Sequence, residues 1–330
     1  MDWVTLPKVE LHLHLDTSLN FEAAVQLKPS LTREVFLRDY VAPEKCLNLA
    51  DFLSRVPRIL ELLQTERGLQ LLTQEMFRQL ADDHMLYAEL RFAPLLHTQQ
   101  GLAPKDIVRI IEAAADKGSK ATGIETRLIL CSLRHFSADQ SMETVQLVDQ
   151  FKGSRVAAFD LAGDEAGYPL ATHLEAFRFA KDRHIAITSH AGEASGAQSV
   201  WETLDQVQPD RLGHGVRSIE DPALVARLKQ MQIHLEMCPT CNVQLEVFPT
   251  YPEHCIDRLY REGLSLGIST DNRTLTPVTL TREYEKMAAT FGWGKQDFQK
   301  CNVNALNAAF VPQPIKDDLL RRLNAAYDRA

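Results

Sequence analysis

The stretch Val9-Glu10-Leu11-His12-Leu13-His14-Leu15-Asp16 alternates apolar and polar residues near the start of the chain. On a β-strand, this alternation places His12 and His14 on one face and the intervening leucines on the other. Because a parallel barrel gathers the C-terminal ends of its strands at one mouth, polar residues that follow distant strands can meet there. Similar side chains end three later apolar runs, at residues 189–193, 212–215 and 269–272.

Short apolar runs alternate with amphipathic segments along the chain, which predicts repeated βα units. Eight strands with helical crossovers favour the α/β class, and within it a closed (β/α)8 TIM-type barrel over an open sheet. The predicted strands cover residues 9–14, 86–91, 127–132, 156–161, 185–190, 211–213, 233–237 and 264–270. Predicted helices cover residues 50–64, 66–82, 170–181, 222–230, 254–262, 281–289 and 314–330.

The connection between the first two predicted strands is far longer than one crossover helix requires. We expect residues 1–330 to form a single barrel domain, in which about 17–85 are a helical insertion. A long structured insertion after a barrel strand usually lies over the active-site mouth, so this segment is predicted to be a wall or lid. The predicted helices at 281–289 and 314–330 would be additional closing helices at the C-terminal end.

The composition is that of a globular protein, with 45% hydrophobic and 24% charged residues. A formal net charge of -8 argues against a nucleic-acid or anionic-membrane surface but allows a small molecule in a pocket. The first residues lack the pattern of a signal peptide, and no apolar run approaches a membrane span. Six cysteines are too few for a disulfide scaffold, so reduced thiols and a cytoplasmic enzyme are predicted, with the oligomeric state open.

Three imidazoles and one carboxylate are a plausible set of ligands for a divalent metal ion. His12 and His14 would supply two imidazoles, His190 a third and Asp271 the carboxylate. The alternative for the first pair is two ordinary histidines on a half-exposed strand. A carboxylate at the C-terminal end of a barrel strand, as Asp271 is predicted to be, favours function over a surface cap.

Two further side chains have a predicted role in proton transfer or in orienting a reactant. Glu193 follows His190 by two small residues and could be a proton shuttle about one substrate width from the metal. The alternative is an exposed glutamate in a loop. His214 stands between two glycines, which indicates a backbone shaped to present it, although a turn histidine remains the alternative.

The absence of a lysine decides between one and two metal ions. Barrel hydrolases with two metals often bridge them through a carboxylated lysine on the fourth strand, and residues 156–163 contain none. A single ion is therefore predicted, with Zn²⁺ preferred and Fe²⁺ or Co²⁺ allowed by the ligand types.

Cys238-Pro239-Thr240-Cys241 has the spacing of a redox pair, but no second pair accompanies it, and we interpret these as structural thiols. The His-x-Glu and Pro-Cys-x-x-Cys signature of the small zinc deaminases is not present.

Jointly, these clusters resemble the adenosine deaminase family of the amidohydrolase superfamily. The matching segments appear in the family's order and extend over nearly the whole chain. They are residues 7–16, 87–94, 159–165, 189–193, 211–215 and 269–272.

The resemblance implies a (β/α)8 barrel with one Zn²⁺ per chain, bound by His12, His14, His190 and Asp271. It also implies that His14 lies beside the substrate. Glu193 would then be the proton donor to purine N1.

The same resemblance assigns the remaining site residues. His214 would orient the attacking hydroxide, together with Asp271. The backbone N–H of Gly163 would contact purine N3, and Asp16 would lie near the sugar.

The chain departs from the usual family pattern at two positions. Thr17 replaces the glycine that usually follows the residue corresponding to Asp16, which adds a β-branched side chain near the expected ribose end. Asn272 replaces the second aspartate that many members have after the metal-binding one. Its amide can still donate a hydrogen bond to purine N7, although without a charge.

The predicted activity is zinc-dependent hydrolytic deamination of a 6-aminopurine nucleoside, most directly adenosine to inosine and ammonia. The alternatives among enzymes are sibling aminohydrolases that act on 6-amino-6-deoxyfutalosine, adenine or an N6-modified adenine nucleotide. An alternative of another class is a catalytically silent purine-binding protein on the same fold. A flat apolar slot for the base is expected, with Phe52 and Val56 as candidates unless they only fill the core of the insertion.

Overall fold

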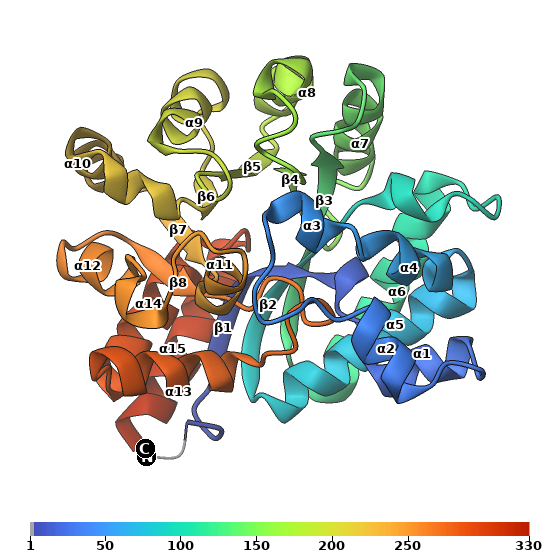
Figure 1. Cartoon of the computed structure of the whole chain (residues 1–330), viewed down its shortest axis with the longest axis horizontal. Helices are drawn as coiled ribbons and strands as arrows, with labels where there is room; N and C mark the ends of the chain where they lie inside the picture. The colour runs from blue at the N-terminus through green and yellow to red at the C-terminus, as the bar shows by residue number, and fades with distance from the viewer. Residues whose placement is uncertain (1–2, 330) are drawn as a thin grey trace.

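The computed structural model describes residues 3–329, and eight parallel strands form one sheet in the order β1 to β8. The last strand returns to the first, because Leu13 forms a parallel bridge with Asp271 and the Asp271 N–H donates to His12 O at 3.1 Å. Figure 1 shows the strands at the centre and helices around them, so the predicted (β/α)8 barrel is confirmed. The strands are β1 Lys8–His14, β2 Met85–Phe92, β3 Glu125–Leu133, β4 Val156–Ala162, β5 Ala186–Ala191, β6 Arg211–His214, β7 His234–Met237 and β8 Leu266–Ile268.

Each predicted strand coincides with an observed one to within a few residues. The last differs most, because the run at 264–270 contributes only three residues of regular strand before the chain turns away. The α-helices are α1 Phe21–Leu27, α2 Arg33–Asp39, α3 Leu49–Leu53, α4 Val56–Leu60, α5 Glu66–Asp82, α6 Pro104–Thr122, α7 Ala138–Gln150, α8 Leu174–Asp182, α9 Ala197–Glu202, α10 Pro222–Met231, α11 Pro239–Gln244, α12 Ile256–Arg261, α13 Leu280–Phe291, α14 Lys295–Ala308 and α15 Gln313–Arg329. Short 3-10 or π turns are η1 Leu15–Thr17, η2 Glu61–Leu63, η3 Pro94–His97, η4 Leu170–His173, η5 Thr203–Val207, η6 Val216–Glu220 and η7 Tyr251–Glu253.

The strands are buried on both faces, as expected of a parallel sheet covered by helices. All eight residues of β2 are buried, and they include two charged ones, Glu89 and Arg91. The apolar side chains of β2 that point outward meet the covering helices, where burial of each large one stabilises the fold by about 1.5–3 kcal/mol. The charged side chains point into the barrel and belong to the site described below.

The insertion between β1 and β2 forms helices α1 to α5, drawn in blue to cyan in Figure 1. The predicted helical segment at residues 50–64 is helical but is divided into three short pieces, α3, α4 and η2. Asn48 caps α3 by accepting the N–H of Asp51 at 2.9 Å. Pro57 has no N–H to donate, so it fits only in the first turn of a new helix, α4.

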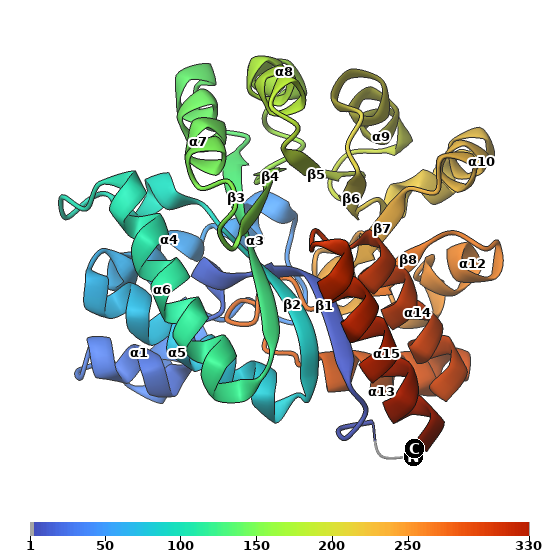
Figure 2. The ribbon, with the colours of Figure 1, turned by 180° about the vertical axis from the view of Figure 1, so that it is seen from behind.

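Three helices follow β8 and complete the covering layer. The predicted helices at 281–289 and 314–330 correspond to α13 and α15, while α14 between them was not predicted. Figure 2 shows α14 and α15 beside β1, and the Val9 N–H donates to Asn302 Oδ1 of α14 at 2.8 Å. Residues 1, 2 and 330 of the predicted domain lie outside the described residues.

The cysteines and the helices bear on two further predictions. All six cysteines are free and buried, which confirms the interpretation of Cys238 and Cys241 as unpaired thiols. Within residues 3–329, none of the helices combines the length and the apolar character that crossing a bilayer demands.

Gly118 permits the close packing of α5 against α6, since an added Cβ would lie 2.4 Å from Cγ of Phe77. We expect Gly118→Ala to lower the free energy of unfolding by about 1–3 kcal/mol through overpacking. This loss should exceed the gain in helix propensity of about 1 kcal/mol. Urea denaturation measures the change, and Phe77→Leu in the same chain should restore part of it. Equal or greater stability of Gly118→Ala would contradict the packing argument.

Candidate active site

Four predicted metal ligands meet at the C-terminal ends of β1, β5 and β8. One ligand atom from each of His12, His14, His190 and Asp271 lies within 4.8 Å of all the others. Asp271 Oδ1 is 3.4 Å from Nε2 of both His12 and His14, and His14 Nε2 is 3.2 Å from His190 Nε2. Side chains separated by more than 250 positions therefore share one point, as the barrel argument predicted.

The donor chemistry of this cluster fits a divalent metal ion. His12 Nε2 and Asp271 Oδ1 are buried and have no hydrogen-bond partner within residues 3–329, an arrangement that is costly unless a cation satisfies them. Burial lowers the pKa of His14 to about 3 and also lowers that of His190. Both rings are then neutral at pH 7, which is the form that binds metals.

A second combination of ligand atoms meets the same distance limit, namely His12, His214, Cys238 and Asp271. Cys238 does not border the cavity described below, whereas His14 and His190 do. Burial also raises the pKa of the Cys238 thiol well above its usual value. An ion that must contact a substrate is therefore better served by the predicted set.

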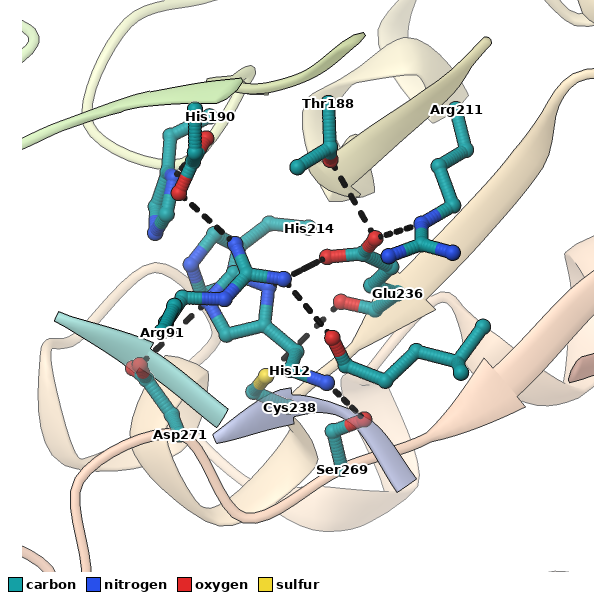
Figure 3. A network of polar contacts seen from close by, with 12 residues as sticks. His12, Arg91, Thr188, His190, Arg211, His214, Glu236, Cys238, Ser269 and Asp271 are labelled. Carbon is teal, nitrogen blue, oxygen red and sulfur yellow. Dashed lines mark hydrogen bonds and ion pairs between the residues drawn. The ribbon is translucent and has the colours of Figure 1, made fainter. Parts of the chain in front are cut away.

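Two buried carboxylates orient the histidine ligands, and one of them, Glu236, is labelled in Figure 3. His12 Nδ1 lies 2.8 Å from Glu236 Oε2, and His190 Nδ1 lies 3.2 Å from Asp160 Oδ1. Each contact places the ring proton on Nδ1 and leaves Nε2 free to face the metal position. Arg91 joins the two carboxylates, donating to Glu236 at 2.6 Å and to Asp160 at 2.9 Å.

The network continues toward the bottom of the barrel. Arg211 Nε donates to Glu236 Oε1, which also accepts the Thr188 hydroxyl at 3.2 Å, and Arg211 forms an ion pair with Glu89. All of these side chains are buried. Two guanidinium groups thus balance three of the carboxylates inside the barrel, which is the condition under which buried charges are tolerated.

The backbone at two site residues is held in the left-handed region. His214 has φ of 59° and Asp271 has φ of 66°, conformations that cost about 1–3 kcal/mol for such residues. Gly213 makes the arrangement around His214 possible, because a Cβ there would lie 2.9 Å from His12 Cε1. The two glycines that predicted a shaped backbone at His214 therefore flank a strained residue beside the metal ligands.

The loop that carries Glu193 is fixed by a carboxylate from the neighbouring strand. Glu165 follows β4 and accepts the backbone N–H groups of four consecutive residues. The distances are 2.7–3.0 Å, and they involve residues 192–195. The hydroxyl of Ser199 donates to the same carboxylate. Glu165 thereby determines where the Glu193 side chain begins.

Glu193 lies at the same mouth, with Oε1 3.5 Å from Nε2 of His214. Its Oε1 is buried and has no hydrogen-bond partner in the described part of the chain. Burial, together with the negative charges of Asp271 and Glu165, raises the pKa of Glu193 well above its usual value. A carboxyl that retains its proton near neutral pH is suited to act as a general acid.

A cavity of about 400 Å³ opens onto these residues and has the size of a small-molecule site. Its apolar wall comes from α3 and α4 of the insertion and includes Phe52, Leu53, Val56 and Leu60. Its polar lining includes the ligands His14, His190 and Asp271, the two residues Glu193 and His214, and the predicted substrate contacts Asp16, Gly163 and Asn272. His12 is fully buried behind this lining.

Asp16 is anchored at the side of the cavity formed by the β2 end. Its Oδ2 accepts the Ala93 N–H at 3.0 Å and lies 3.8 Å from Nε2 of His97. Burial opposes ionisation of Asp16, but His97 and the Ala93 N–H lower its pKa below the usual value. Asp16 is therefore available at neutral pH as a charged hydrogen-bond acceptor.

The groups that support the site were not predicted from the sequence. The ligands or the acid loop are held in place by Asp160, Glu165, Glu236, Arg91 and Arg211. A signal for them does exist, because charged residues interrupt apolar strands in Glu89-Leu90-Arg91, Phe159-Asp160-Leu161 and Leu235-Glu236-Met237. Such positions are almost never fully buried without a partner.

The fold and the clustered side chains define a (β/α)8 barrel with a candidate metal site at the C-terminal ends of its strands. A profile of the family described as adenosine deaminase matches residues 7–326. An adenosine deaminase of Enterococcus faecalis is 35% identical over 328 residues, covering 98% of this chain and 97% of the relative. An adenosine deaminase of Clostridium acetobutylicum is 33% identical over 328 residues, covering 97% and 98%. The chain belongs to the adenosine deaminase family and is a hydrolytic deaminase.

Solved structures show the same barrel at lower identity. An adenine deaminase from Arthrobacter aurescens has a TM-score of 0.90 at 24% identity, covering 98% of this chain and 100% of that chain. An amidohydrolase from Burkholderia ambifaria with bound Zn has a TM-score of 0.91 at 23% identity, covering 99% and 92%. Arabidopsis ADAL complexed with IMP has a TM-score of 0.89 at 24% identity, covering 100% and 99%. These similarities establish the shared fold.

Glu236 offers a test of the supporting network that leaves every ligand in place. We expect Glu236→Gln to weaken metal affinity by about 10–100-fold, because an amide polarises the His12 ring less than a carboxylate does. Competition with a chromophoric chelator measures the affinity, and circular dichroism monitors the fold. The matched control is Glu175→Gln, at an exposed position of α8. A folded Glu236→Gln protein with unchanged affinity would show that this carboxylate does not tune the site.

Proposed function

We propose that this deaminase hydrolyses the 6-amino group of an uncharged purine nucleoside, most directly adenosine to inosine and ammonia, with one zinc ion per chain. The observation that carries the proposal is the convergence, in one cavity, of the His14, His190 and Asp271 ligand atoms with the buried carboxyl of Glu193, whose pKa is raised well above its usual value. Curated relatives with near-complete coverage bear the name adenosine deaminase, which supports the same reaction.

His12, His14, His190 and Asp271 would hold the ion. A zinc ion in such a site lowers the pKa of water from 15.7 to about 7 and so provides hydroxide at neutral pH. The solved neighbour with bound Zn supports the choice of metal.

The protein groups then direct the addition of water to C6 of the ring. Glu193 donates its proton to ring N1, which removes electron density from C6 and opposes the aromatic resistance to attack. His214 and Asp271 hold the attacking oxygen. The proton released from the attacking water is transferred to the amine, the C–N bond breaks, and ammonia departs. The remaining hydroxyl proton on the C6 oxygen returns to Glu193, which leaves the 6-oxo purine.

The cavity walls account for binding of a flat base. The apolar side chains of α3 and α4 would cover one face of the ring. We propose that the insertion to which these helices belong, residues 17–85, serves as the lid of a single domain. The Gly163 backbone and the Asn272 amide would meet the polar ring edges, N3 and N7. His14 would lie against the reacting end of the ring.

The charges around the cavity separate the candidate substrates. Within residues 3–329, no lysine or arginine lines it, while Asp16 and Asp164 do. A phosphate placed at N9 would meet carboxylates without a cationic partner, and a carboxylate, as in 6-amino-6-deoxyfutalosine, would meet the same obstacle. Asp16 instead suits a sugar hydroxyl, which adenine lacks. The nucleotide complexes of the solved neighbours therefore do not determine the preference proposed here.

A silent purine-binding protein on this fold would not require the acid, the ligand set and their supporting carboxylates together. We further propose a cytoplasmic setting, which suits six free buried thiols.

Glu193→Gln tests the acid directly. The amide cannot supply a proton of suitable acidity, so we expect kcat on adenosine to fall by at least about 10²–10⁴-fold while zinc content stays at the wild-type level. Ammonia release and elemental analysis measure the two quantities, with Glu175→Gln as the exposed control. Full turnover by Glu193→Gln would exclude this residue as the proton donor.

A substrate panel tests the charge argument. We expect kcat/KM for adenosine to exceed that for AMP and for N6-methyl-AMP by at least about thirtyfold, corresponding to roughly 2 kcal/mol for an unpaired buried charge. Adenine should be a poorer substrate than adenosine because it cannot use Asp16. Ammonia release, or methylamine release from N6-methyl-AMP, provides the measurement across the panel, which also includes 6-amino-6-deoxyfutalosine. A preference for AMP would overturn the assignment of the nucleoside.

A further inference from the structure

The two positions at which this chain departs from the usual family pattern are in direct contact. The Thr17 hydroxyl donates a hydrogen bond to Oδ1 of Asn272, across 255 positions of sequence. Both side chains are buried, with exposed fractions of 4% and 7%, and both border the cavity. Because Thr17 and Asn272 are hydrogen-bonded to each other, the two differences from the family pattern are interpreted together.

The backbones on both sides of this contact are fixed. The Thr274 N–H donates to Thr17 O at 2.8 Å, and the Arg273 N–H donates to the hydroxyl of Ser18 at 3.1 Å. Asn272 itself accepts the Thr276 N–H at 2.7 Å through its backbone oxygen. These bonds join the loop after β1 to the loop after β8. The Thr17 hydroxyl and the Asn272 amide therefore meet in a defined geometry.

The amide of Asn272 has one accepting end and one donating end, and they point in different directions. Thr17 occupies the accepting end, Oδ1. Among residues 3–329, no group accepts a hydrogen bond from Nδ2. The free N–H groups of Nδ2 are thus the part of Asn272 that remains for a ligand, and Asn272 presents a donor.

The position of Asn272 indicates which ligand atom would meet this donor. Asn272 directly follows the ligand Asp271 and lines the same cavity as Glu193, so a ring whose C6 faces the metal position would bring its edges toward these two side chains. On a purine, the ring nitrogens on the two sides of C6 are N1 and N7. If Glu193 protonates N1, the lone pair of N7 is the acceptor left for Asn272.

We propose that Thr17 is a specificity-determining residue, whose hydroxyl holds the Asn272 amide with Nδ2 toward the ligand and so selects rings that have a lone pair at N7. The inference rests on the proposed function, since it takes a 6-substituted purine as the ligand. Thr17 acts through Asn272 and is a positioning residue. Without the hydroxyl, the amide is free to turn Oδ1 toward N7, where two lone pairs repel each other.

The test compares binding of inosine and 7-deazainosine, in which a C–H replaces N7, by calorimetry on the metal-loaded protein. We expect wild type to prefer inosine by about 3–10-fold, in the range of one hydrogen bond. Thr17→Val keeps the shape but removes the hydroxyl, and its preference should fall below about twofold, because only inosine binding weakens. Thr17→Ser retains the hydroxyl and is the matched control, with the preference of wild type. Thr17→Ala repeats the comparison if the valine variant does not fold.

Three outcomes would overturn the inference. They are an unchanged preference in both Thr17→Val and Thr17→Ala, an equal loss of affinity for both ligands, and no preference for inosine in wild type. An equal loss would mean that Thr17 only shapes the cavity. Ammonia release from adenosine is measured in parallel. A wild-type protein that prefers inosine but releases no ammonia would refute the proposed activity and leave the role of Thr17 standing.

Discussion

The site depends on the ion pairs that the buried guanidinium of Arg91 forms with two carboxylates. This guanidinium joins Glu236 and Asp160, and these two carboxylates in turn orient His12 and His190. Removing one partner from such a buried network costs about 3–5 kcal/mol, because an uncompensated charge remains in the interior. The same cation therefore makes the carboxylates tolerable in the core and aligns the imidazoles. Stability and ligand geometry are coupled through one side chain.

The catalytic mouth combines this rigid base with strained and buried groups above it. His214 and Asp271 adopt left-handed backbone conformations that the closed barrel sustains. Glu165 fixes the loop of Glu193, and burial beside other carboxylates raises the pKa of Glu193 well above its usual value. Each feature would be unfavourable in isolation. Each becomes useful when a positively charged ion and a neutral ring enter the same cavity.

The cavity's substrate preference follows from charge and from one amide. Its lining holds carboxylates and apolar side chains, which suits a neutral nucleoside better than an anionic one. The amide of Asn272, after β8, adds a hydrogen-bond donor to the cavity. The hydroxyl of Thr17, after β1, sets the direction of that donor. Solved relatives share the fold at about 24% identity, so differences of this local kind are what would separate their substrates.

The sequence by itself determined the strand positions, the barrel and the residues that meet at its mouth. Alternation in residues 9–16 and the polar ends of later apolar runs are local signals, and closure of parallel strands converts them into proximity. Only the tertiary structure decided how those residues are supported. Arg91, Glu236 and Glu165 act on partners far away in sequence, and no spacing encodes such pairs. The contact of Thr17 with Asn272 is of the same kind, because it exists only where β8 returns to β1.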